Sequence, residues 1–230
     1  HVARSHHSTV RPELSFGAND DRGDFFDPEN NFYYLTGDAV AEGEGPPLRL
    51  PTVDGDGRAT SPTVLAVGGG DGLFEAEKET GRVTGNNIIS WSPGQDTWYE
   101  TVKLNYGYDF TQTGKDARKY PHASAPELPV PDTWKKMDEV IAYWQEAGVD
   151  GFRADMAHMV PPEFWRWLIE RSRGRQPHVY WMAEAYDTDP ARVPGGDPAV
   201  AEVTEGEVMP ELLDAGFDAV YDDMTYDALK

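Results

Sequence analysis

The chain contains no cysteine, so disulfide bonds and thiolate metal sites are excluded and the redox compartment stays undecided. It has no run of about 18 apolar residues, the length that a membrane-spanning helix requires, and no stretch typical of a signal peptide. The first residue is His1 and not methionine, so an address signal could precede the sequence. The localisation is therefore left open.

Basic residues are scarce. The chain has 20 Lys and Arg against 41 Asp and Glu, a formal net charge of −21. Nucleic acids and anionic membranes would be repelled by such a chain, and we expect neither as a partner. A neutral or cationic ligand stays possible, although a solvated acidic surface is the simpler explanation of the charge.

What is present is typical of a globular protein. The 230 residues are 39% hydrophobic and 12% aromatic, which allows a packed core in one domain, or in one domain with a sizeable insertion. Up to about residue 131 the sequence is rich in Gly, Pro, Asp and Asn, and helical periodicity is almost absent. Short β-like runs predict a few antiparallel strands there, at residues 31–36, 63–67, 87–91 and 98–104.

The second half alternates between helical and strand-like patterns. Asp132 is a plausible N-cap for a helix that Gly148 ends. Strands are then predicted at residues 149–155, 178–184 and 217–222, separated by helices at residues 161–173 and 208–215. This alternation predicts an α/β fold in which helices cover parallel strands.

The stretch "DGFRADMAHMVPPEFW" places Arg153 and Asp155 on the same face of a strand that is otherwise apolar. The next strand, "VYWMAEAY", ends at Glu184, so two carboxylates lie at the C-terminal ends of adjacent parallel strands, where such folds carry their sites. This pair suits nucleophile and acid work on a glycosidic bond. Arg153 would keep Asp155 ionised, and the apolar neighbours of Glu184 would favour its protonated form. A structural Arg–Asp pair beside an unrelated Glu is the alternative.

These motifs resemble the α-amylase family, glycoside hydrolase family 13. "GFRADMAH" is similar to the family's second signature, in which Arg precedes the nucleophile Asp by two residues, and "MAEAY" is similar to the third, which holds the general acid Glu. "HVARSHHS" resembles the continuation of the first signature, whose last His would be His1. "TVKLNYGYDF" lies where the late signature of the B domain is expected, and "GFDAVYDDMTYDAL" resembles the sixth barrel strand.

The resemblance implies a partial TIM (β/α)8 barrel, from the end of strand 3 to strand 6, with an irregular β-rich B-domain insertion. Residues 1–131 would hold the end of strand 3 and the insertion, and residues 132–230 barrel helix 3, strands 4 to 6 and their helices. The family's last signature lies on strand 7, and nothing after Phe217 supplies it, so the chain is expected to be an internal fragment of a larger enzyme.

The same resemblance implies a retaining glycoside hydrolase acting on α-glucans such as starch, glycogen and maltooligosaccharides. Asp155 would be the nucleophile and Glu184 the general acid and base, while Arg153, His1 and His158 would contact the substrate. No metal ligand is assigned and no cofactor is implied with certainty. Calcium stays possible, although the Asn before the first-signature His, a family calcium ligand, would precede this sequence.

Three other functions stay open. The first is an α-glucan transglycosylase of the same family, which acceptor-side contacts would distinguish from a hydrolase. The second is a non-catalytic, carbohydrate-binding relative with idle carboxylates. The third is an unrelated acidic α/β binding domain, which a separation of Asp155 and Glu184 well beyond the roughly 5 to 5.5 Å of a retaining pair would favour.

Overall fold

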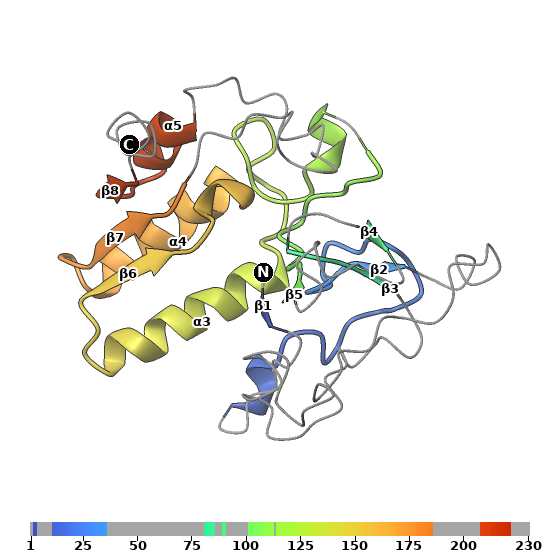
Figure 1. Ribbon diagram of the computed structural model, residues 1–230, viewed down its shortest axis with the longest axis horizontal. Helices are drawn as coiled ribbons and strands as arrows, with labels where there is room; N and C mark the ends of the chain where they lie inside the picture. Colours follow the sequence, from blue (N-terminus) through green and yellow to red (C-terminus); the bar gives the residue numbers. More distant parts are fainter. Residues whose placement is uncertain are drawn as a thin grey trace, which may run out of the picture. The chain divides into compact units, whose positions relative to one another are not determined.

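The computed structural model describes residues 2–3, 11–35, 81–85, 89–90, 101–112, 114–185 and 208–221. The chain divides into two compact units, His1–Gly107 and Tyr108–Lys230, and each has its own sheets (Figure 1). Within the described ranges, no helix has both the length and the apolar character needed to cross a membrane.

The first unit contains two small antiparallel sheets. One pairs β1 (Val2–Ala3) with β5 (Thr101–Val102). The other has the order β2-β3-β4, formed by Tyr34–Leu35, Gly81–Val83 and Ile89–Ser90. The predicted antiparallel strands are confirmed where β2, β4 and β5 fall inside them, and the run at residues 63–67 lies outside the described residues. Strand β3 was not predicted, because "GRV" shows no apolar alternation.

A half-buried carboxylate organises the loop that precedes β2. Asp20 accepts hydrogen bonds from the backbone N–H groups of Asn31 and Phe32 and from the Tyr34 hydroxyl at 2.7 Å. Phe32 and Tyr34 are almost fully buried. Burial, reinforced by the charge of Asp20, raises the pKa of the Tyr34 hydroxyl above its usual range. The hydroxyl therefore stays protonated and able to donate to Asp20.

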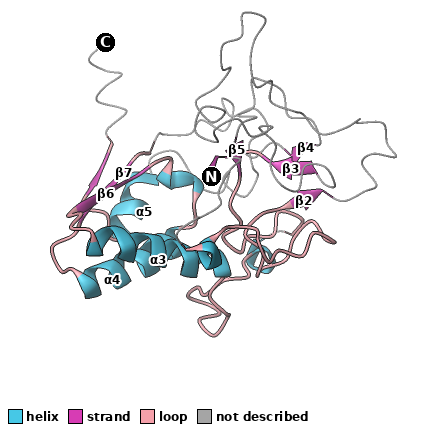
Figure 2. Ribbon diagram, turned by 90° about the horizontal axis from the view of Figure 1, so that it is seen from below, coloured by secondary structure: helices cyan, strands magenta, loops and turns pink. Residues whose placement is uncertain are grey.

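The second unit is built on a parallel sheet with the order β6-β7-β8. Figures 1 and 2 show the helices α3, α4 and α5 gathered along the same face of this sheet. The observed α/β alternation confirms the predicted order, with shifts of a few residues at the ends. The elements of this unit are α3 (Asp132–Glu146), β6 (Gly151–Ala154), α4 (Pro162–Arg175), β7 (Tyr180–Ala183), α5 (Val208–Asp214) and β8 (Ala219–Val220). It also has the 3₁₀ turns η3 (Gly114–Ala117) and η4 (Ala157–Met159), and the first unit has the 3₁₀ turn η1 (Pro12–Leu14).

The start of α3 corrects one prediction. The N-cap is Pro131, which supplies no side-chain hydrogen bond, and Asp132 is the first helical residue. The Asp132 carboxylate instead pairs with Lys136 one turn later, at 3.0 Å. The predicted end of the helix is confirmed: Gly148 has a φ of +92°, its N–H donates to Gln145, and the N–H of Val149 donates to Trp144. These two bonds form a Schellman motif, which favours glycine at this position.

Aromatic side chains fill the space between the parallel sheet and its helices. Trp181 of β7 is 2% exposed, and its ring lies 5.0 Å from that of Phe152 on β6. Its indole N–H donates to the Ser172 hydroxyl of α4 at 3.0 Å. Trp165 of α4 contacts Phe217 before β8 at 5.2 Å. Phe152 and Trp181 point toward the helices. Successive side chains of a strand point to opposite faces, so the residues that alternate with these two on β6 and β7 point away from the helices.

Candidate active site

The three parallel strands end in register. Ala154 of β6 pairs with Ala183 of β7, which pairs with Val220 of β8. The ladder continues beyond the strands, since the N–H of Glu184 donates to Ala154 and the N–H of Tyr221 donates to Ala183. The residues that follow the strands therefore lie side by side at the C-terminal end of the sheet. These residues are Asp155, Glu184 and Tyr221.

Arg153 joins these three side chains. Its Nη1 donates to Asp155 Oδ1 at 2.7 Å, its Nη2 lies 2.8 Å from Glu184 Oε1, and its Nε donates to the Tyr221 hydroxyl at 2.9 Å. The Arg153–Asp155 contact predicted from strand parity is therefore present. Glu184 is mostly buried, with 11% of its side chain exposed, whereas Asp155 is 57% exposed. One carboxylate is thus open to a ligand, and the other is recessed beside it.

The electrostatics of the cluster follow from these contacts. The hydrogen bond from Arg153 lowers the pKa of the Asp155 carboxyl, and a hydrogen bond with the Glu184 side chain acts in the same direction. Hydrogen bonds to Tyr221 and Asp155 raise the pKa of the Arg153 guanidinium. Asp155 is therefore ionised at neutral pH, the state that a carboxylate nucleophile requires.

Met156 turns the backbone toward Glu184. It is the only described residue other than glycine with a positive φ, at +48°, a left-handed conformation that a side chain makes costly. Its N–H donates to Glu184 Oε2 at 3.0 Å. The Glu184 carboxylate is therefore held by Arg153 on one oxygen and by this amide on the other.

His158 lies in η4, close to the backbone of Glu184. Its imidazole is largely buried and hydrogen-bonds to the backbone of Glu184. Burial lowers the pKa of His158 below its ordinary value, and the contact with Glu184 opposes that shift. His158 is therefore close to the carboxylate cluster through its contact with the Glu184 backbone.

The remaining predicted site features lie outside this cluster or outside the described residues. His1 is outside the described residues. In the part of the chain that the structure describes, no group of three or more His, Asp or Glu residues is arranged to hold a metal ion.

Two members of the cluster were not predicted from the sequence. Tyr221 follows "FDAV" just as Asp155 follows "GFRA" and Glu184 follows "YWMA", so the position after each strand was a usable signal. Met156 gave none, since a left-handed residue other than glycine cannot be read from residue type.

Part of the chain is similar in sequence to bacterial maltosyltransferases. It matches no family model. It is 43% identical over 99 residues to an alpha-1,4-glucan:maltose-1-phosphate maltosyltransferase of Pseudomonas aeruginosa, a match that covers 43% of the chain and 14% of that relative. It is 38% identical over 53 residues to the enzyme of the same name from Myxococcus xanthus, covering 23% of the chain and 8% of that relative. The chain thus spans a small part of these relatives' length.

Solved structures with similarity to the chain include an Anoxybacillus alpha-amylase, with 21% identity and a TM-score of 0.33 over 44% of the chain and 20% of that protein. Another is the cyclic alpha-maltosyl-(1→6)-maltose hydrolase of Arthrobacter globiformis, with 21% identity and a TM-score of 0.28 over 50% of the chain and 22% of that protein.

Proposed function

Because the chain resembles the α-amylase family and matches its maltosyltransferases, we propose that it carries the nucleophile and the general acid of a retaining α-glucan transglycosylase. The supporting observation is that one guanidinium contacts carboxylates at the ends of two adjacent parallel strands. The proposed donor is an α-maltosyl compound and the proposed acceptor an α-1,4-glucan, which are the substrate classes in the relatives' name. Hydrolysis of α-glucans is the same chemistry with water as the acceptor.

The first half-reaction would use both carboxylates. An oxygen of Asp155 attacks the anomeric carbon, the bond from that carbon to the leaving oxygen breaks, and Glu184 gives its proton to that oxygen. The product is a glycosyl ester of Asp155. Arg153 keeps the attacking carboxylate ionised and oriented, which the short Nη1–Oδ1 distance of 2.7 Å supports.

The second half-reaction reverses these roles. Glu184, now ionised, takes a proton from an acceptor hydroxyl, and the acceptor oxygen displaces Asp155 from the anomeric carbon. The configuration of that carbon is retained because it is inverted twice. In this proposal His158 and His1 contact the substrate, and His1 contacts the sugar bonded to Asp155.

We extend the proposal to the fold. The strands β6, β7 and β8 would be strands 4 to 6 of a (β/α)8 barrel, with residues 132–230 holding these strands and their helices. Residues 1–131 would hold the end of strand 3 and a B-domain insertion. The parallel order of the three strands and the helices along one face support this placement.

The test uses the full-length protein that carries these residues. Asp155→Asn should abolish the glycosyl-enzyme seen by mass spectrometry, because an amide is a far poorer nucleophile. Glu184→Gln should lose about 10²- to 10⁴-fold with α-maltosyl donors whose leaving group is a sugar hydroxyl, but keep most activity on aryl glycosides, whose leaving groups need little protonation. Equal loss on both donor types would contradict the roles assigned here.

Product analysis then distinguishes transfer from hydrolysis. With maltooligosaccharides and an α-maltosyl donor, a transglycosylase lengthens the acceptor by maltosyl units, whereas a hydrolase releases glucose and maltose. Saturable binding of maltooligosaccharides with neither outcome would identify a non-catalytic relative and overturn the proposal.

A further inference from the structure

We propose that Tyr221 is a positioning residue that fixes the Arg153 guanidinium between the two carboxylates and thereby sets the ionisation of Asp155. This inference rests on the proposed function, since it concerns the same site. It starts from the register of the strands, which places Tyr221 beside Glu184 at the C-terminal end of the sheet, where Asp155 also lies.

The geometry of a guanidinium makes the third contact decisive. The group is planar, and its five N–H donors are fixed relative to one another. Arg153 uses Nη1 for Asp155, Nη2 for Glu184 and Nε for Tyr221. With Nε held by the Tyr221 hydroxyl, the plane and its rotation are both defined. Without that acceptor, the plane can swing about its two carboxylate contacts, and the side chain is exposed enough, at 41%, for water to compete.

The Tyr221 ring contributes a second contact, since the Arg153 guanidinium carbon lies 5.5 Å from the ring centre. The backbone N–H of Tyr221 pairs with Ala183 independently of the side chain. Replacement of Tyr221 by Phe therefore keeps the strand pairing and the aromatic ring and removes only the hydroxyl acceptor. The substitution isolates the contact on which the proposal depends.

The consequence for the reaction is a change in pH dependence. When Arg153 is held less firmly, Asp155 loses part of the hydrogen bond that lowers its pKa. A larger fraction of the enzyme then carries a protonated, inactive nucleophile at mildly acidic pH. The acidic limb of the kcat/KM profile of Tyr221→Phe should move to higher pH, by about half a unit to one unit, with kcat lowered about tenfold and KM within about twofold.

Tyr180→Phe is the matched control. Tyr180 belongs to β7 of the same sheet, and its side chain is 50% exposed. The same hydroxyl is removed from a neighbouring strand, outside the cluster, so the activity and the pH profile should equal those of the wild type. An equal effect from both substitutions would show a general loss of sheet stability and would overturn the positioning role.

An NMR measurement tests the hydrogen bond from Arg153 Nε to the Tyr221 hydroxyl without an assay of catalysis. In the wild-type protein, the Arg153 Nε–H should give an NMR signal that exchanges slowly with water because it donates to Tyr221, and Tyr221→Phe should lose it. Absence of this signal from the wild type overturns the proposal whether or not the variant folds.

The kinetic outcomes distinguish a failure of the proposed function from a failure of the positioning role of Tyr221. A wild-type protein that forms no glycosyl-enzyme contradicts the proposed function, while the NMR measurement still tests the hydrogen bond from Arg153 to Tyr221. An active wild type with an unchanged Tyr221→Phe profile contradicts only the positioning role. A change confined to KM would make Tyr221 a sugar-contacting residue and would also overturn the inference.

Discussion

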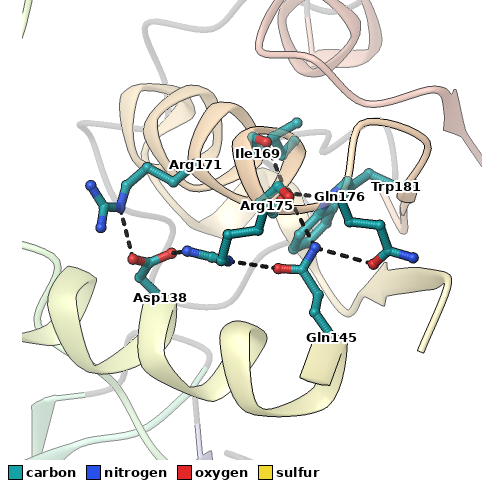
Figure 3. Close-up of polar contacts among 8 residues, drawn as sticks. Asp138, Gln145, Ile169, Arg171, Arg175, Gln176 and Trp181 are labelled. Atoms are coloured by element: carbon teal, nitrogen blue, oxygen red, sulfur yellow. Dashed lines mark hydrogen bonds and ion pairs between the residues drawn. The ribbon is translucent and has the colours of Figure 1, made fainter. Parts of the chain in front are cut away.

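Asp138→Asn should cause a large loss of stability away from the candidate site. Asp138 lies on α3 with 6% of its side chain exposed. Its two oxygens accept hydrogen bonds from two arginines of α4, Arg171 Nε and Arg175 Nη1, each at 2.7 Å. Figure 3 shows this fork between the helices and its extension through Gln145. Gln145 accepts from Arg175 at 2.8 Å and donates to the Ser172 carbonyl at 2.9 Å.

The loss in the free energy of unfolding depends on which hydrogen bonds an asparagine can still accept at this position. The amide oxygen can accept from one arginine, but the amide nitrogen faces the other guanidinium as a second donor. Removing one partner of a buried ion pair costs about 3 to 5 kcal/mol, and one hydrogen bond to a charged group contributes about 1.5 to 3 kcal/mol. Arg171 and Arg175 are 52% and 31% exposed, so water can solvate the released guanidinium. We therefore expect the lower part of this range, about 2 kcal/mol.

Urea unfolding of the full-length protein measures this loss, and a thermal melt should show a decrease of roughly 4 to 8 °C for a domain of this size. Glu146→Gln is the control, because it makes the same change of charge on the same helix at an exposed position. Its effect should stay within about 0.5 kcal/mol. Equal effects of the two substitutions, or a loss under 0.5 kcal/mol for Asp138→Asn, would refute the reasoning.

Two further predictions concern backbone conformation and pH. Gly148→Ala and Gly216→Ala both place a side chain at a positive φ, at a cost of about 1 to 2 kcal/mol. Only the Gly216 methyl would also press on Ile169, at 3.3 Å. Gly216→Ala should therefore unfold at the lower urea concentration, and equal unfolding midpoints would contradict this. Burial lowers the pKa of His158, so the unfolded chain binds its proton at a higher pH than the folded chain does, and stability should fall as the pH decreases below about 6.5. His158→Gln should flatten that slope between pH 7.5 and 5.5, and an unchanged slope would show that His158 does not contribute.

The second half of the chain was predictable because each of its elements has a strong local pattern. The helix α3 has apolar residues at helical spacing and a glycine at its end, and β6 and β7 are short apolar runs between helices. The first half has no such signal. Strand β3 is only three residues long, and it is defined by its pairing with β2 and β4 rather than by its own residues. Pairing between distant segments cannot be read from local periodicity.

The candidate site was predictable to the same extent. Strand parity placed Arg153 and Asp155 on one face, and the structure has them in contact. The surroundings of Glu184 were predicted less well. Its neighbours Met182 and Ala183 indicated a partly apolar setting, but the structure places Arg153 Nη2 at 2.8 Å from its carboxylate. The reason is the register between β6 and β7, which brings the two strands' polar residues together and which no single strand encodes.

This shared arginine sets a condition on the proposed mechanism. A retaining reaction needs Asp155 ionised and Glu184 protonated at the same moment, whereas Arg153 attracts a negative charge on both. Glu184 therefore has to gain its proton while its contact with Nη2 is weakened, and the contact of Nη1 with Asp155 has to persist. A guanidinium held only by the two carboxylates would move as one group and release both. In the proposed mechanism the Tyr221 contact at Nε gives Arg153 a third fixed point, so that a sugar entering the site can disturb the contact with Glu184 and leave the contact with Asp155 in place.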